Sequence, residues 1–204
     1  MTGRPAQWTN WGRTLSYRPT RMVTPADAAE VVAVMATARR DGLRVKPLGS
    51  GHSFSPLAVT DGVQVRLDRL TGLVGTDIDA ASGKGTVTVG AGTTLRALNA
   101  DLTKRGLGLA NMGDIDVQTV SGAIATGTHG SGRASASLSA LVVALEIALP
   151  DGSLVRCSAA HEPDLFRAGR LGLGALGVVT SVTFRAERAF RLHAVEAPGS
   201  LDDL

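Results

Sequence analysis

The chain has 204 residues, 44% hydrophobic but only 3% aromatic, which excludes a disordered chain and predicts a core of Ala, Val and Leu. The net charge of +3 comes mostly from scattered arginines, with no basic stripe among aromatic residues, so nucleic-acid binding is not expected. The lone Cys157 excludes an intrachain disulfide and predicts a small core residue. The longest apolar run, 31–38, is too short to span a bilayer and residues 1–7 carry no secretory signal, which predicts a cytoplasmic protein.

The first predicted elements form a strand–helix–strand unit. Residues 21–23 predict a short strand, followed by a helix that Thr24 can cap and that Gly42 ends. The apolar face of this helix carries Val31, Val34, Met35 and Ala38. Strands at 44–48 and 63–67 follow, so parallel pairing is expected in this part of the chain.

The pattern changes near residues 75–85, where we place the division between two α+β lobes. Residues 86–89 alternate like a half-buried strand, and a helix capped by Thr93 or Thr94 then runs to Gly106. Its buried face carries Leu95, Leu98 and Leu102.

The remaining elements follow an irregular segment at 111–132. Residues 141–149 and 153–157 predict a hairpin around a Pro-Asp-Gly turn. A helix at 163–170 and a strong strand at 178–184 complete the second lobe.

Residues 172–177 match the G-x-G-x-x-G dinucleotide pattern letter by letter. A Rossmann site is nevertheless rejected, because that fingerprint must follow a strand and open a helix, whereas here a helix precedes and a strand follows. The motif predicts only a close approach of the backbone to something, and an ordinary helix-to-strand turn is the favoured interpretation.

Two further segments are candidate ligand contacts. Gly49–Ser53 follows a strand, opens no helix and lacks the Lys-Ser/Thr of a P-loop, but its amides can form a nest for phosphate oxygens with His52 at the tip. From the spacing alone, a surface-loop histidine is the favoured interpretation. Ser121–Gly132 contains almost only small residues, which suits close contact with a large planar ligand, the alternative being a flexible loop.

Other catalytic patterns are missing from the sequence. His129 and His161 lack metal-ligand spacing, so no metal site is expected. No G-x-S-x-G elbow is present, and Asp114 and Asp116 are expected to be solvated carboxylates in a loop.

Taken in order, five segments resemble flavoproteins of the vanillyl-alcohol-oxidase type, with a PCMH-type FAD-binding domain. The resemblance is strongest to the aldonolactone oxidases, with the alditol oxidases nearby. The segments are Trp8–Trp11, Gly49–Phe54, Asn111–Gly113, Ser121–Gly132 and Gly172–Thr180.

The resemblance implies an α+β fold in which a small lobe with parallel strands joins a larger lobe with a mostly antiparallel sheet flanked by helices. Residues 1–190 would form the FAD-binding domain, with lobes at about 18–78 and 79–190. Residues 191–204 would begin a substrate or cap domain that the chain lacks. A fragment, a truncated gene, and a separate partner that supplies the cap all remain open.

The resemblance also implies the cofactor and its contacts. FAD would be held with its pyrophosphate on the Gly49–Ser53 loop and a covalent bond from His52 to the flavin 8α-methyl carbon. Many members of the family have Ser where Asp114 stands in this sequence. The cofactor-binding residues so implied are Pro47, Leu48, Gly49, Ser50, Gly51, His52, Ser53, Gly113, Asp114, Ser121, Gly122, Thr126, Gly127, His129, Gly130, Val178 and Val179.

The implied activity is oxidation of a CH–OH group in a sugar lactone such as L-gulono-1,4-lactone or D-arabinono-1,4-lactone, with FAD accepting the hydride. Oxygen or another acceptor would reoxidise the flavin. An alditol oxidase domain and a flavin-binding remnant without turnover are the alternatives. No catalytic base is assigned, because relatives take it from the cap, and the sequence leaves the exact substrate, the acceptor and the oligomeric state open.

Overall fold

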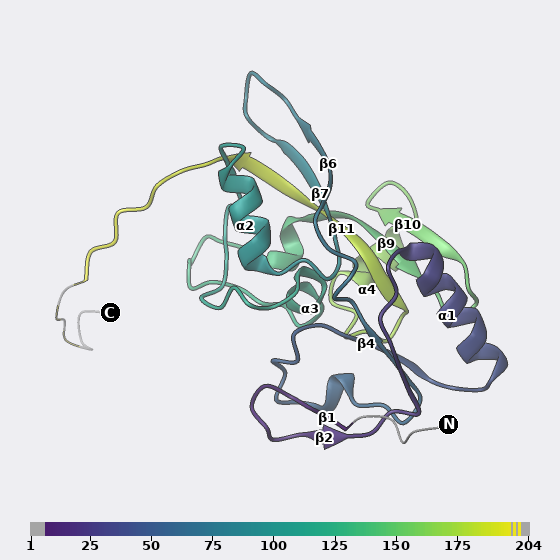
Figure 1. The fold of residues 1–204 in the computed structure, drawn as a ribbon. Coiled ribbons are helices and arrows are strands. Elements are labelled where there is room, and N and C mark those ends of the chain that lie inside the picture. The colour runs from purple at the N-terminus through teal and green to yellow at the C-terminus, as the bar shows by residue number, and fades with distance from the viewer. Residues whose placement is uncertain (1–6, 197, 199, 201–204) are drawn as a thin grey trace.

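The computed structural model describes residues 7–196, 198 and 200. A small parallel sheet has the strand order β3-β5-β4, with β3 at Arg21–Val23, β5 at Val63–Arg66 and β4 at Val45–Leu48. The expected parallel pairing is confirmed, but β5 lies between the other two strands and pairs with both. Helix α1 (Ala28–Arg40) makes the crossover from β3 to β4 (Figure 1).

The start of α1 differs from the sequence prediction. Asp27, not Thr24, caps the helix, because its carboxylate accepts the Glu30 amide at 2.8 Å. The Glu30 side chain in turn accepts the Ala26 amide at 2.7 Å, so two otherwise unpaired amides are satisfied reciprocally. The predicted inner face is buried at Val31, Met35 and Ala38 and partly buried at Val34.

A larger sheet of six strands forms the second lobe, and every strand pair in it is antiparallel. Its order is β10-β9-β11-β7-β6, and β8 pairs with the end of β11. The strands are β6 (Leu73–Ile78), β7 (Gly85–Gly90), β8 (Leu107–Gly108), β9 (Val142–Ala148), β10 (Leu154–Ser158) and β11 (Val178–Arg188).

Strand β6 corrects the predicted lobe boundary. It pairs with β7 in the large sheet, so the change from one sheet to the other falls between Arg66 and Leu73 and not after residue 78. The segment escaped prediction because Gly75 interrupts its alternation at a register shift in the strand pair.

Three α-helices belong to this second lobe: α2 (Leu95–Thr103), α3 (Val120–Ala125) and α4 (Pro163–Gly169). Thr94 caps α2, and the three predicted leucines of that helix are buried. Short 3₁₀ turns, η1 (Pro56–Ala58) and η2 (Leu138–Leu141), complete the helical elements. Cys157 is fully buried as expected, and this burial raises the pKa of its thiol.

Helix α3 is an element that the sequence did not predict, because it lies within the segment 111–132 that was expected to be irregular. Thr119 caps the helix, and Val120, Ala123 and Ile124 are buried in the main core. Small side chains here let the helix backbone approach its neighbours closely, while the single Ile124 provides the bulk.

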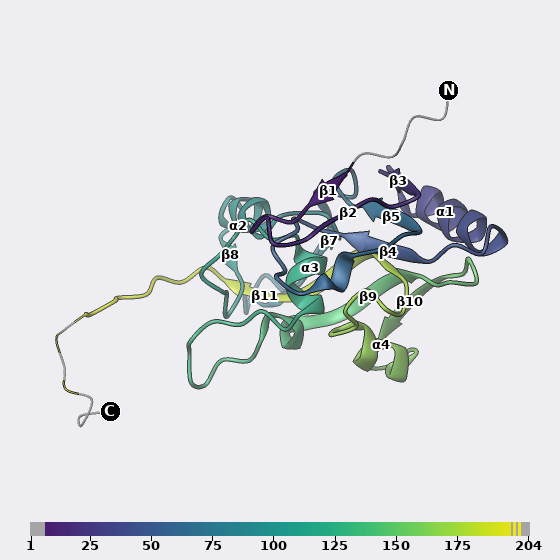
Figure 2. The same ribbon diagram turned by 90° about the horizontal axis from the view of Figure 1, so that it is seen from below.

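The two lobes share apolar packing and are not joined by a free linker. Ala148 and Val178 of the large sheet belong to the same buried cluster as Val31 of α1 and Val65 of β5. Seen from below, the small sheet lies over strands β9 and β11 (Figure 2). The hairpin of β1 (Trp8–Thr9) and β2 (Ser16–Tyr17) lies beside the small sheet. Among the described residues no helix is long and apolar enough for a transmembrane span.

Candidate functional site

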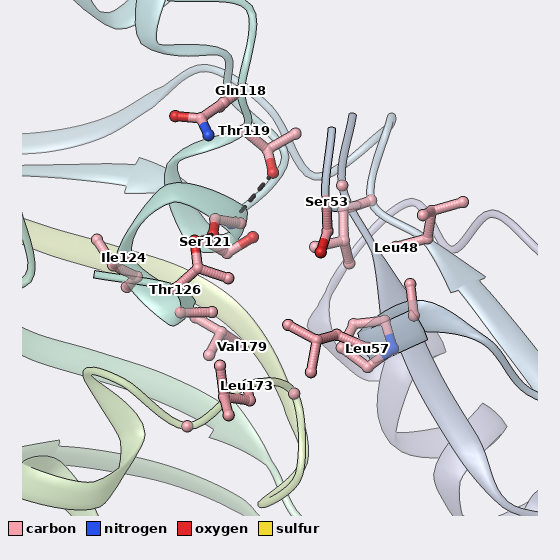
Figure 3. Close-up of a pocket in the computed structure, with 18 of the residues that line it drawn as sticks. Leu48, Ser53, Leu57, Gln118, Thr119, Ser121, Ile124, Thr126, Leu173 and Val179 are labelled. Atoms are coloured by element: carbon pink, nitrogen blue, oxygen red, sulfur yellow. Dashed lines mark hydrogen bonds between the residues drawn. The ribbon is translucent and has the colours of Figure 1, made fainter. Parts of the chain in front are cut away.

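A cleft of about 360 Å³ lies between the two lobes, a size typical of small-molecule sites. Figure 3 shows its facing walls, with Leu48, Ser53 and Leu57 of the small lobe on one side. The other side carries Gln118, Thr119, Ser121, Ile124 and Thr126 from α3 and its flanks, together with Leu173 and Val179.

The first wall is the loop at Gly49–Ser53 that follows β4. The Ser50 hydroxyl donates to the Val117 carbonyl at 2.6 Å, which fastens the loop to the segment that leads into α3. Within the described residues, the backbone amides of Ser50 through Ser53 donate to no protein acceptor. Since buried or half-buried amides are normally paired, this run of free donors fits oxygen atoms of a ligand such as a pyrophosphate.

The second wall is helix α3, whose entry is held by neighbouring backbone. Thr119 Oγ1 accepts the Gly122 amide at 3.2 Å, and the Ser121 hydroxyl donates to the Ala91 carbonyl at 2.8 Å. A Cβ on Gly49 would lie 2.3 Å from Thr119 Oγ1, so the first two walls touch at a position where only glycine fits without displacement.

The third wall is the turn between α4 and β11, which contains the G-x-G-x-x-G pattern. Leu173 and Gly174 both adopt the left-handed backbone conformation, with φ of 51° and 64°. A Cβ on Gly174 would lie 2.9 Å from Pro47 Cγ, so this turn closes against the small lobe. Helix α4 precedes this turn and strand β11 follows it, which confirms that the motif is not a Rossmann site. The turn nevertheless lines the cleft and is not merely a connection.

The chemistry of the cleft is almost entirely neutral. Of the described residues that line it, His52 alone carries an ionisable side chain. The remaining polar groups are hydroxyls, one amide side chain and backbone, set among apolar residues. Such a lining can hold a large, partly apolar ligand through its backbone, but it offers no carboxylate or lysine as a general base.

His52 is itself held by an aromatic contact. The Trp11 ring stacks on the imidazole with centroids 5.1 Å apart and planes at 25°. Trp11 also meets Phe54 edge-on at 6.4 Å.

The structure brings most of the sequence-predicted residues together. Those that line the cleft are Pro47, Leu48, Gly49, Ser50, Gly51, His52, Ser53, Ser121, Gly122, Thr126 and Val179. Those that do not line it are Gly113, Asp114, Gly127, His129, Gly130 and Val178.

Of the predicted residues that do not line the cleft, Val178, Gly130 and Gly113 pack against other parts of the protein. Val178 is fully buried in the core, whereas its neighbour Val179 faces the cleft. Gly130 packs against the Met112 carbonyl, where a Cβ would come within 2.4 Å, so its lack of a side chain is explained by the protein itself. A Cβ added to Gly113 would lie 3.4 Å from the His129 carbonyl oxygen, so Gly113 also packs against protein backbone.

Several lining residues were missed by sequence reasoning. They are Phe54, Leu57, Ala58, Leu67, Gln118, Thr119, Ile124, Ala125, Ile147, Gly169, Gly172, Leu173, Gly174, Leu176 and Gly177. The glycine-rich turn was visible in the sequence but judged an ordinary connection. Phe54, Ile124 and Ala125 lie inside segments that the sequence singled out, although they were not named as contacts. For Leu57 and Ile147 no local signal existed, because an apolar residue looks the same facing a cleft as facing a core.

Charged side chains near the site form surface pairs. Arg96 and Asp116 make an exposed ion pair at 2.9 Å, and hydrogen bonding to Arg96 lowers the pKa of the Asp116 carboxyl. No group of His, Cys, Asp and Glu suited to a metal ion exists within residues 7–196.

Two lobes, glycine-rich walls and a row of free amides define a domain that binds a nucleotide-type cofactor along the junction of its lobes. Comparison of the sequence with protein families identifies it: the chain belongs to the FAD binding domain family, whose model matches residues 19–158.

Relatives and solved structures agree with this assignment. The chain is 41% identical to L-gulono-1,4-lactone dehydrogenase of Mycobacterium tuberculosis over 95% of this chain and 44% of that protein. It is 39% identical to D-arabinono-1,4-lactone oxidase of Eremothecium gossypii, over 92% and 35% respectively. The chain therefore spans less than half the length of these relatives. Cholesterol oxidase from Brevibacterium sterolicum has a similar fold, with a TM-score of 0.77 at 25% identity, covering 89% of this chain and 37% of that one.

Proposed function

We propose that this chain is the flavin-holding part of an FAD-dependent oxidoreductase that acts on a sugar lactone such as L-gulono-1,4-lactone or D-arabinono-1,4-lactone. The observation that carries the proposal is the neutral cleft between the lobes, lined by free amides and with His52 as the one ionisable side chain among its described residues. The lactone-oxidising relatives named above supply the substrate class.

The cleft residues fit FAD by their chemistry. The amides of Ser50–Ser53 and the nearby hydroxyls would bind the phosphates, since backbone donors bind anions without needing a lysine or arginine. The apolar walls, including Ile124, Leu173 and Val179, suit the faces of a planar ring system. When bound, the flavin supplies hydride acceptance, while the protein orients it and excludes water.

We also propose a covalent bond from the His52 imidazole to the flavin 8α-methyl carbon. Support comes from the location of His52, half-buried in the cleft loop and stacked on Trp11. A covalent link prevents loss of cofactor and raises the flavin potential.

Lactone oxidation also requires a group that takes up the hydroxyl proton and residues that hold the substrate carbon in a reactive pose. With His52 committed to the flavin, the described part of the chain places no second ionisable group in the cleft for this task. We therefore propose that substrate recognition needs the part of the relatives that this chain does not match.

The test begins with the 204-residue chain expressed and loaded with FAD. We expect a yellow protein that keeps its flavin through acid precipitation, and a His52→Ala variant that binds FAD but releases it on denaturation. Release of all flavin by the denatured wild type would contradict the covalent bond, and failure to bind FAD would contradict the proposed function.

Turnover is then measured with L-gulono-1,4-lactone, D-arabinono-1,4-lactone and xylitol, using oxygen or a dye as acceptor. We expect no efficient turnover by this chain alone. A rate of about 1 s⁻¹ or more would show that a complete substrate site lies within these residues. A preference for xylitol would favour an alditol oxidase instead.

A further inference from the structure

The N-terminal hairpin of β1 and β2 holds the His52 loop from both sides. The Trp11 amide donates to the Gly51 carbonyl at 2.9 Å, just before His52. The side-chain amide of Asn10, which is 4% exposed, donates to the Ser53 carbonyl at 3.0 Å, just after it. The backbone on either side of His52 is thereby attached to Asn10–Trp11.

Gly51 itself is shaped by this contact. Its φ is +72°, and a Cβ there would lie 2.6 Å from the Trp8 ring, so the hairpin packs directly on the loop. The hairpin is secured in turn by the Tyr17 hydroxyl, which donates to the Ala58 carbonyl at 2.9 Å.

The Trp11 side chain makes contacts that are separate from those of its backbone. The residue is 66% exposed, so it contributes little to a hydrophobic core. Its aromatic contacts are the stack on His52 at 5.1 Å and the edge contact with Phe54. An indole face laid on an imidazole restricts the rotation of that ring, whereas the neighbouring backbone hydrogen bonds fix only the main chain.

We propose that Trp11 is a positioning residue for covalent flavin attachment: its ring holds the His52 imidazole in the orientation from which its nitrogen meets the flavin methyl carbon. This inference rests on the covalent bond proposed above. Bond formation joins the imidazole nitrogen to the methyl carbon and breaks one C–H and one N–H bond. It leaves two electrons and two protons on the flavin ring, and dioxygen takes them up as hydrogen peroxide.

The expected magnitude follows from the freedom that the stack removes. Immobilising one side chain is worth about threefold to tenfold in an equilibrium or rate. Loss of the ring should therefore slow covalent attachment by about threefold to tenfold, while the reversible affinity for FAD, which depends on the loop backbone, stays within about twofold of the wild type.

The experiment mixes each purified apo-chain with FAD in air and follows acid-stable flavin over time, with the dissociation constant measured separately in the His52→Ala background. The variants are Trp11→Ala, Trp11→Phe, which keeps an aromatic face, and the control Val74→Ala, which truncates a side chain of similar exposure (68%) on β6. We expect a slow rate in Trp11→Ala, a largely restored rate in Trp11→Phe and a wild-type rate in Val74→Ala.

The outcomes separate the two proposals. If the wild type forms no acid-stable flavin, the covalent bond is refuted together with this inference. If the wild type forms it and Trp11→Ala forms it equally fast, only the role of Trp11 is refuted. A parallel loss of FAD affinity and thermal stability in both Trp11 variants would also overturn the inference, because it would assign the ring a purely structural role.

Discussion

The contact between Gly49 and Thr119 leads to a sharp prediction about how the two lobes meet. A Cβ on Gly49 would lie 2.3 Å from Thr119 Oγ1, the same oxygen that caps α3 by accepting the Gly122 amide. The substitution Gly49→Ala must therefore rotate the hydroxyl away from the helix, because a cap and a methyl group cannot share this space.

The magnitude follows from three effects. Loss of an N-cap costs about 0.5–2 kcal/mol, and crowding of a packed site costs about 1 kcal/mol or more. Replacing glycine also lowers the conformational entropy of the unfolded chain. This stabilises the folded state by about 0.4–1 kcal/mol, since φ at Gly49 is one that alanine tolerates. We expect Gly49→Ala to lower the free energy of unfolding by about 1 kcal/mol.

A double-mutant cycle tests this reasoning. In a Thr119→Ala background the obstructing hydroxyl and the cap are already gone, so Gly49→Ala should be neutral or slightly stabilising. Urea unfolding of the four apo-chains supplies the coupling energy, expected to be about 1 kcal/mol. If Gly49→Ala costs the same in both backgrounds, the two residues do not compete for this space and the reasoning is wrong.

Two further predictions concern other residues. Gly127 has φ of +70°, so Gly127→Ala should lower the free energy of unfolding by about 1 kcal/mol, whereas Gly75→Ala, with open space and no positive φ, should not; equal unfolding midpoints would contradict this. Because Arg96 lowers the pKa of Asp116, this pair's contribution to stability is present at neutral pH and is lost as the pH falls through the lowered pKa. Arg96→Ala should return the carboxyl pKa towards its ordinary value in an NMR titration, and an unchanged titration would contradict the assignment.

Much of the fold could be predicted because its signals are local. The leucines of α2 repeat on one helical face, and the Pro-Asp-Gly turn joins β9 to β10 as expected. The mostly antiparallel second sheet and the parallel first sheet are both confirmed. The helix face and the turn depend on periodicity and turn chemistry within a short stretch of chain, whereas the mostly antiparallel second sheet was expected from the family resemblance.

Other features depended on contacts that no local pattern records. Helix α3 looked like irregular chain, because its small residues show no apolar face until α2 and the large sheet pack around them. Strand β6 became visible only through its pairing with β7.

The candidate site also has features that the sequence indicates and features that only the structure shows. The sequence by itself made Gly49–Ser53 a candidate ligand loop with His52 at its tip, because glycine and small polar residues after a strand can form a nest of amides, but the spacing alone equally fitted a surface loop. Only the tertiary structure placed the turn at Gly172–Gly177 in the same cleft as this loop and laid Trp11 on His52. These contacts join segments dozens of residues apart, and they depend on how two lobes pack, which the spacing of residues along a chain does not encode.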